Sequence, residues 1–152
     1  KISAEQNNLN ALFLLAKLYD EGLGIDHNIE EAFKLYRKAA EQGLATSQHA
    51  VGTMYQNGTG IAKNDGEAYK WFLKAAKQNY VKTQILLGTK HALGKGVDLD
   101  LEKSLSWFYI AKSNGDQSSS KVIEIVRSKL TSQEIANAKK LAKIWSKENP
   151  KK

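Results

Sequence analysis

Hydrophobic positions along this chain follow a pattern that repeats every 36 residues. Glycines mark the period, because Gly22, Gly58 and Gly94 are equally spaced along the sequence. The apolar positions keep the same register, and three of the matched sets are Leu15, Val51 and Leu87; Tyr36, Phe72 and Phe108; and Ala39, Ala75 and Ala111. A period of this length is the sequence signature of an array of supersecondary elements. One such element cannot bury its apolar face alone, so the pattern predicts repeats that stack on their neighbours.

The second repeat shows the two helices that the pattern predicts in every repeat. Residues 45–57 place apolar side chains at helical spacing. Gly58 and Gly60 end this first helix, since glycine readily adopts the left-handed conformation of a C-terminal cap. Asn64 then predicts the N-terminal cap of a second helix over about 65–78, with Glu67 three residues on. The equivalent caps predicted in the first and third repeats are Asn28 and Asp100.

Both ends of the chain fit the same period. Residues 4–6 match residues 40–42, so residues 1–6 are expected to end the second helix of a preceding repeat in a longer array. At the other end, residues 117–129 predict the first helix of a fourth repeat. Thr131 with Glu134 predicts a capping box for a final helix that closes the array. The expected buried stripe of that helix is Ile135, Ala138, Leu141, Ala142 and Trp145.

The sequence therefore predicts an all-α solenoid of helix-turn-helix repeats with a C-terminal capping helix. The expected segments are residues 1–6 as the end of a preceding repeat, 7–42, 43–78 and 79–114 as three full repeats, 115–130 as half a repeat, 131–147 as the capping helix and 148–152 as a tail. The capping helix is expected to turn a polar face to water, as the last element of an array must.

The repeats also carry a motif at fixed positions. In the second repeat these positions are Val51, Gly52, Tyr55, Gly58, Gly60, Ile61, Ala68, Trp71, Phe72, Lys74, Ala75 and Ala76. This pattern resembles the Sel1-like repeat (SLR) family, which is related to the tetratricopeptide repeats. The third repeat departs from the family pattern at His91, where tyrosine is usual. The resemblance implies a right-handed α–α superhelix that acts as a non-catalytic adaptor in protein complexes. It also implies a bacterial protein that belongs to the envelope or the periplasm or is exported.

Charge is distributed unevenly along the chain. The net charge is +7, and residues 117–152 carry +6 of it, with nine basic and three acidic residues. A solvated face of the capping helix explains this basic segment, with Lys139, Lys140, Lys143 and Lys147 facing water. A docking surface for an acidic partner is the alternative interpretation. Nucleic acid is a weaker one, because no aromatic residues alternate with the basic ones to stack on bases.

The chain lacks the residue patterns that most enzymes and metal sites need. It has no cysteine, which excludes disulfides, thiolate metal sites and a cysteine nucleophile. His27, His49 and His91 do not have the spacing of metal ligands on a helix, so no metal site is expected. The Gly-x-Gly loops follow helices rather than strands, which favours plain turns over phosphate binding. We expect no enzymatic activity and no cofactor, and no apolar run reaches the length of a membrane helix.

The first helices of the repeats are expected to line the concave face of the solenoid. With Leu15 at the centre of the buried side, helical geometry selects the positions that point away from it. These expected partner-binding positions, here called the groove positions, are Asn10, Phe13, Lys17, Asp20, Thr46, His49, Thr53, Gln56, Lys82, Ile85, Thr89 and Lys121. Phe13 and Ile85 are the expected apolar anchors among polar positions. The alternative is that both side chains belong to the core.

These patterns predict a module that binds a peptide or a helix of another protein in its groove. The main functional signal is the contrast between varied groove positions and repeating buried positions, because a contact surface need only suit its partner. Two other interpretations stay open: the basic capping helix docks an acidic protein surface, or the repeats act as a spacer in a longer protein. The expected module is a monomer in isolation that neither inserts into membranes nor binds nucleic acid.

Overall fold

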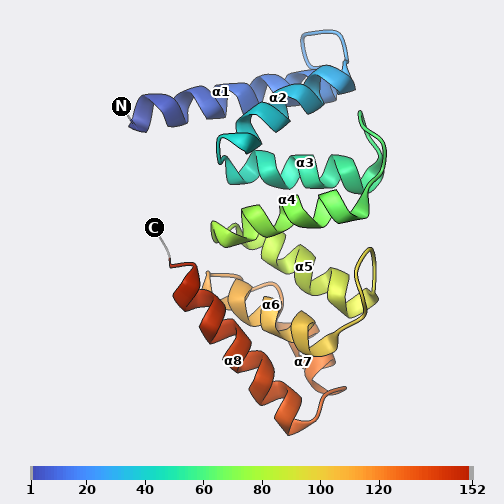
Figure 1. Ribbon diagram of the computed structural model, residues 1–152, viewed down its shortest axis with the longest axis vertical. Coiled ribbons are helices and arrows are strands. Elements are labelled where there is room, and N and C mark those ends of the chain that lie inside the picture. The colour runs from blue at the N-terminus through green and yellow to red at the C-terminus, as the bar shows by residue number, and fades with distance from the viewer. Residues whose placement is uncertain (1, 151–152) are drawn as a thin grey trace. The chain divides into compact units, whose positions relative to one another are not determined.

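The computed structural model describes residues 2–150, with side chains from Glu5 onwards, and this part of the chain consists of α-helices and connecting loops (Figure 1). Its eight helices are α1 Ile2–Glu21, α2 Ile29–Glu41, α3 Ala45–Asn57, α4 Asp65–Lys77, α5 Val81–Leu93, α6 Leu101–Ser113, α7 Ser120–Arg127 and α8 Ser132–Glu148. The prediction of an all-α repeat fold is confirmed. The chain forms two compact units, residues 1–75 (unit 1) and residues 76–152 (unit 2), which divide within α4.

The helix bounds follow the predicted repeat closely over most of the chain. Helix α3 covers the predicted residues 45–57, and α4 ends one residue before the predicted limit. Helix α7 is shorter than the predicted span of 117–129. Before this helix the Asp116 carboxylate accepts hydrogen bonds from the backbone N–H groups of Ser118 at 2.8 Å and Ser119 at 3.1 Å, and these bonds hold the turn that leads into α7.

The N-terminal helix differs from the expected segmentation. Helix α1 runs unbroken from Ile2 to Glu21, so residues 2–6 form its first turns rather than the separate end of a preceding helix. Residues 5–8 are exposed, and therefore no packing contact favours a bend after residue 6. The backbone keeps its helical hydrogen bonds there instead. Lys1 lies outside the described residues.

The predicted caps are confirmed in all three repeats. The Oδ1 atoms of Asn28 and Asn64 each accept a hydrogen bond of 3.0 Å from the backbone N–H three residues on. Asp100 Oδ1 does the same at 2.8 Å. Thr131 and Glu134 form the complete capping box at the start of α8, with both reciprocal hydrogen bonds present. Each of these helix starts therefore has one of its otherwise unpaired N–H groups satisfied by the residue that the sequence predicts.

The core of unit 1 lies among its helices, and small residues let those helices approach closely. The buried cluster comprises Ala16, Ala32, Phe33, Tyr36, Ala40, Val51, Met54 and Trp71. Phe72 is fully buried beside Gly52 of α3, where an added Cβ would lie only 2.6 Å from Phe72 Cε1. A buried hydrogen bond of 3.1 Å from Gln48 Nε2 to the carbonyl of Ala40 joins α3 to the end of α2.

Unit 2 repeats these contacts 36 residues later. Phe108 is fully buried beside Gly88, and Gln84 Nε2 donates a buried hydrogen bond of 3.1 Å to the carbonyl of Ala76. Helix α8 covers α6, and the rings of Trp107 and Trp145 meet edge to face with centroids 4.6 Å apart. The buried cluster around Phe108 also contains Leu105, Ile123, Val126 and Ala138.

The expected buried side of the first helix is wrong. Ala16 is fully buried in the unit 1 core, whereas Leu15 is 40% exposed. Leu15 matches Val51 in the period, and Val51 is fully buried because α2 packs against α3. The described part of the chain leaves the corresponding side of α1 uncovered, so the exposed side chains there include Leu14 and Leu18.

The expected buried stripe of the capping helix needs one correction. Ala138 and Ala142 are buried, and Ile135 and Trp145 are half-buried, but Leu141 is 44% exposed. The two alanines bring α8 close to α6 along a narrow line of contact. Leu141 projects from the side of that line and stays in solvent.

Candidate protein-binding surfaces

Unit 1 carries the predicted groove positions of α1 and α3. Asn10 and Lys17 are exposed, and Asp20 is half-buried. The α3 positions, all half-buried, are Thr46, His49, Thr53 and Gln56. Two charged positions are already engaged, because Lys17 Nζ lies 3.6 Å from Glu21 Oε1 and the Tyr36 hydroxyl donates a hydrogen bond to Asp20. Burial, with Asp20 and Glu21 nearby, raises the pKa of Tyr36, so Tyr36 stays protonated and keeps Asp20 in place.

The two expected apolar anchors contribute to the core as well as to the surface. Phe13 is half-buried, and its ring lies 5.4 Å from that of Tyr36 at an angle of 54°. Ile85 is half-buried and packs against the unit 2 core around Leu105 and Phe108. Each side chain therefore reaches the surface with only part of its area. Truncating either one would change stability as well as any binding.

Unit 2 carries its groove positions on α5 and α7. Lys82, Thr89 and Lys121 are exposed. Thr89 Oγ1 donates a hydrogen bond of 3.0 Å to the carbonyl of Ile85, and Thr53 Oγ1 makes the equivalent bond to His49 in unit 1. Because both hydroxyls donate to a carbonyl of their own helix, each can only accept a hydrogen bond from a partner.

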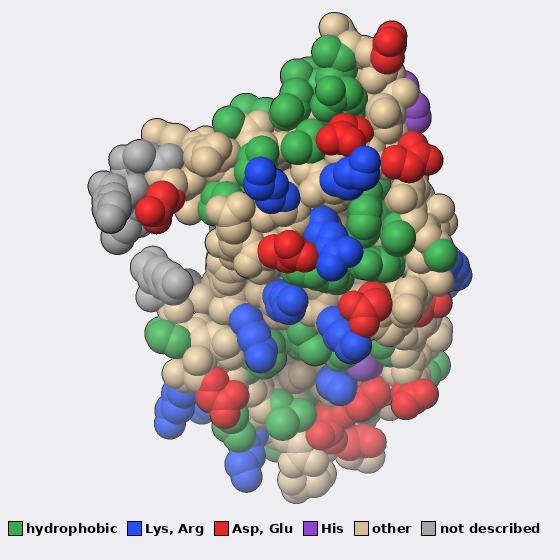
Figure 2. Space-filling model, turned by 45° about the horizontal axis from the view of Figure 1, so that its top comes forward, with side chains coloured by type: hydrophobic (Ala, Val, Ile, Leu, Met, Phe, Trp, Pro, Cys, Tyr) green, Lys and Arg blue, Asp and Glu red, His purple; other side chains and the backbone are tan. Residues whose placement is uncertain are grey.

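The surface in view in Figure 2 mixes acidic, basic and hydrophobic side chains without a large region of one sign. The uncovered side of α1 and the loop after it add exposed leucines in unit 1, among them Leu14 at 59% and Leu23 at 56%.

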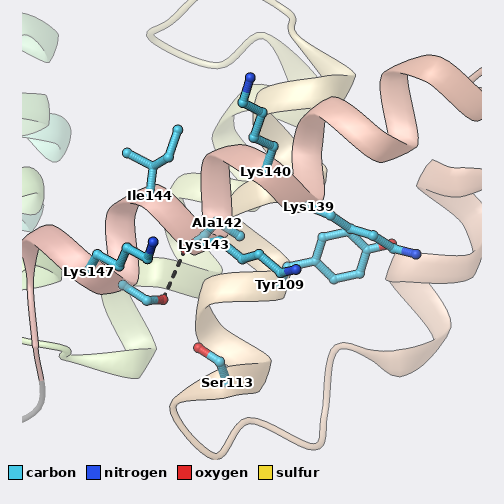
Figure 3. A pocket seen from close by; sticks show the side chains of 9 residues that line it. Tyr109, Ser113, Lys139, Lys140, Ala142, Lys143, Ile144 and Lys147 are labelled. Atoms are coloured by element: carbon cyan, nitrogen blue, oxygen red, sulfur yellow. Dashed lines mark hydrogen bonds between the residues drawn. The ribbon is translucent and has the colours of Figure 1, made fainter.

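The basic capping helix borders a pocket that the sequence did not predict. Lys139, Lys140, Lys143 and Lys147 are exposed, as predicted for a polar face. They lie around a pocket of about 600 Å³, which α6 and α8 form together (Figure 3). Tyr109 and Ser113 of α6 line it from the other side. No sequence pattern marks this pocket, because it arises from the packing of two helices that are not consecutive in the chain.

His91 lies at the repeat position that holds Tyr19 and Tyr55 in the other two repeats, and it is almost fully buried in α5. Only 4% of it is exposed, and its Nδ1 lies 3.3 Å from the carbonyl of Asp98. Burial lowers the pKa of His91, and the charge of Lys103 lowers it further. The Asp98 carbonyl and the carboxylates of Asp98 and Asp100 oppose this shift without reversing it. The ring is therefore neutral in the folded protein at neutral pH.

We expect the free energy of unfolding to fall as the pH drops below about 6.5. In that range the histidine of the unfolded chain takes up a proton, whereas buried His91 takes one up only at lower pH. His91→Tyr, which restores the residue type of the other repeats, should remove this part of the pH dependence. Urea unfolding of both proteins between about pH 8 and about pH 5 checks it. His27→Gln, at an exposed position, is the control, and equal pH slopes for His91→Tyr and the unaltered chain would refute the assignment.

The described residues place no group of three or more His, Asp or Glu side chains where they could hold a metal ion. Within residues 2–150, no helix combines the length and the apolar character needed to cross a membrane. The histidines differ in burial, since His27 is exposed, His49 is half-buried and His91 is buried.

Comparison with solved structures finds close relatives of this arrangement. The crystal structure of a Sel1 repeat protein from Oxalobacter formigenes shares 34% identity with a TM-score of 0.75, and the match covers 93% of this chain and 59% of that one. The crystal structure of c5321, a protective antigen present in uropathogenic Escherichia coli strains and displaying an SLR fold, shares 28% identity with a TM-score of 0.64. That match covers 97% of this chain and 39% of the antigen. The chain thus spans less than two thirds of either protein.

Sequence comparison gives the same family. Curated protein sequences give no match to the chain. The family model described as the Sel1 repeat matches residues 9–44, 45–80 and 81–116, each beginning two residues after the predicted repeat boundary. These matches cover more than half of the chain and confirm the resemblance drawn from its motif. The chain belongs to the Sel1 repeat family.

Proposed function

We propose that this chain is a non-catalytic binding module that holds a peptide or a helix of a partner protein against the first helices of its repeats, taking each unit by itself: α1 and α3 in unit 1, and α5 and α7 in unit 2. Sel1 repeat solenoids generally mediate interactions between proteins. The observation that carries the proposal is the contrast between neighbouring positions of the repeat. Positions 13, 49 and 85 are Phe, His and Ile and reach the surface, whereas the buried positions 16, 52 and 88 are Ala, Gly and Gly.

Buried positions keep small residues because they must preserve one packing arrangement between helices. The groove positions instead combine aromatic, aliphatic, hydroxyl and charged side chains, a mixture typical of protein contact surfaces. This composition supports a specific partner rather than a purely architectural role.

Selection of binders from a random peptide library, followed by exposed-site variants, tests the proposal while the natural partner is still unidentified. Lys82→Glu and Thr89→Arg on α5 change groove positions that are exposed and outside the core. We expect each to weaken binding of the selected peptides by about tenfold or more, because contact residues at an interface centre carry most of the affinity. Fluorescence anisotropy measures the affinity, and the melting temperature verifies the fold.

Matched controls on second helices are Lys38→Glu of α2 and Lys70→Glu of α4, which are also exposed. Unchanged affinity in the α5 variants, with unchanged melting temperatures, would exclude the groove model. Equal losses in the second-helix controls would also exclude it, because the effect would then follow net charge alone.

A further inference from the structure

The pocket between α6 and α8 has the size of a ligand site. Its volume is about 600 Å³, and its walls are mostly apolar, with Tyr109 from α6 and Ala142 from α8 (Figure 3). Pockets that bind small groups in proteins have volumes of about 300 to 1,000 Å³ and combine apolar walls with a few polar groups. The hydroxyl of Ser146 does not donate into the pocket, because Oγ already donates a hydrogen bond of 3.0 Å to the carbonyl of Ala142.

The helices that form this pocket are fixed against each other. The edge-to-face contact of Trp107 with Trp145 joins α6 to α8, and Asn137 Nδ2 donates a hydrogen bond of 3.2 Å to Glu102 Oε2 across the same interface. A ligand would therefore meet walls that are already in place, which reduces the entropy lost on binding.

The lysines around the pocket lack acidic partners. Lys139, Lys140, Lys143 and Lys147 are exposed, and none of them makes an ion pair with the side chains that the structure describes. Elsewhere exposed lysines of this chain do pair, as Lys70 does with Glu67 at 2.6 Å. Lys139, Lys143 and Lys147 follow one another at i, i+4 spacing, where like charges destabilise a helix by a few tenths of a kcal/mol per pair. A bound anion would relieve this repulsion.

The ring of Tyr109 forms part of the pocket wall. Its hydroxyl is buried and has no hydrogen-bond partner among the described residues. Because almost none of the hydroxyl is accessible, a ligand in the pocket would contact the ring and not the hydroxyl.

We propose that this pocket binds an acidic segment of a partner protein, with one apolar side chain inserted against Tyr109 and flanking carboxylates paired with the lysines of α8. Lys139 and Lys147 are separated by about 12 Å along the helix at 1.5 Å per residue. An extended peptide covers that distance with about four residues. The occupant is therefore a short acidic motif with a central apolar residue. It is distinct from the proposed groove ligand, since the pocket and the groove positions share no residue.

A short fluorescein-labelled peptide of aspartates and glutamates with one central phenylalanine is the probe, measured by anisotropy with the full chain. The double variant Lys139→Gln/Lys143→Gln should weaken its binding by about fivefold or more. Binding should also weaken steeply between about 0.01 M and about 1 M salt, because the Debye length falls from about 30 Å to about 3 Å.

The Tyr109→Phe variant should leave the affinity unchanged, because it keeps the ring that lines the pocket and removes only a buried hydroxyl. The charge-matched control is Arg127→Gln/Lys129→Gln, at exposed positions outside the pocket. The groove variant Thr89→Arg should leave this probe's affinity intact, which keeps the outcome independent of the proposed function.

Three results would overturn the proposal. The first is equal affinity for a peptide with serine in place of the phenylalanine, which would show that the pocket is not filled. The second is an equal loss in Arg127→Gln/Lys129→Gln, which would show attraction to net charge alone. The third is binding of dodecanoate in competition with a dye at this pocket while the peptide does not bind, which would assign the pocket to a small amphipathic anion.

Discussion

Truncation of Phe72 to alanine is expected to lower the free energy of unfolding by about 3 to 5 kcal/mol. The ring is fully buried in unit 1, against Gly52 and beside the ring of His49, at a centroid distance of 5.6 Å. Its removal forfeits the burial of a large apolar surface and leaves a cavity that helices α3 and α4 cannot fill without moving. Urea unfolding followed by circular dichroism measures the loss.

The matched control for this truncation is Leu14→Ala, which removes a large apolar side chain that is 59% exposed. It should cost less than about 1 kcal/mol, as surface substitutions do. Phe108→Ala, the equivalent change in unit 2, should match Phe72→Ala because Phe108 is also fully buried. A loss at Phe72 no larger than that at Leu14 would contradict the assigned core.

Substitution of Gly52 by valine is expected to destabilise the protein by about 1 to 3 kcal/mol through overpacking. The first added atom, Cβ, would lie 2.6 Å from Phe72 Cε1 and 2.7 Å from Cδ1, inside normal contact distance. Phe72 is fully buried, so its ring has no free volume into which to move. The helices must separate to accept the side chain, and the melting temperature should fall accordingly.

The control for overpacking is Gly66→Ala in the first turn of α4. Gly66 is exposed, and the nearest atom to an added Cβ there is Asn64 Oδ1 at 3.4 Å. Alanine at this position should stabilise the helix by up to about 1 kcal/mol, because alanine restricts the unfolded chain and favours the helix. If both substitutions were stabilising, Gly52 would be an ordinary helix position rather than a site of close approach.

The sequence predicts most of this fold because its strongest signals are local. Asn28, Asn64 and Asp100 cap helices through bonds to residues three positions on, so their role depends on nearby backbone alone. The 36-residue period predicts how the helices of each repeat pack, since Phe72 and Phe108 each contact a glycine of the preceding helix. These features follow from spacing along one chain.

The surfaces are harder to predict because exposure depends on what a neighbouring helix covers. Leu15 and Val51 are equivalent in the period, yet α2 covers the side of α3 that bears Val51 and the matching side of α1 stays uncovered. Helical spacing puts Leu141 in the buried stripe, but the contact of α8 with α6 is too narrow to reach it. The pocket at Tyr109 depends on contact between helices that are distant in sequence, for which the repeat offers no template.

The buried hydrogen bonds of Gln48 and Gln84 determine how such a chain can change its length. Each joins the start of a first helix to a carbonyl eight residues earlier, at the end of the preceding second helix. Duplication of residues 41–76 regenerates the same junction, because Gln48 then follows Ala76 at the same distance. An insertion between Ala40 and Gln48, or between Ala76 and Gln84, would move the glutamine away from its acceptor and leave both buried groups unpaired. Repeats can therefore be added in whole units, while the length of each junction stays constant.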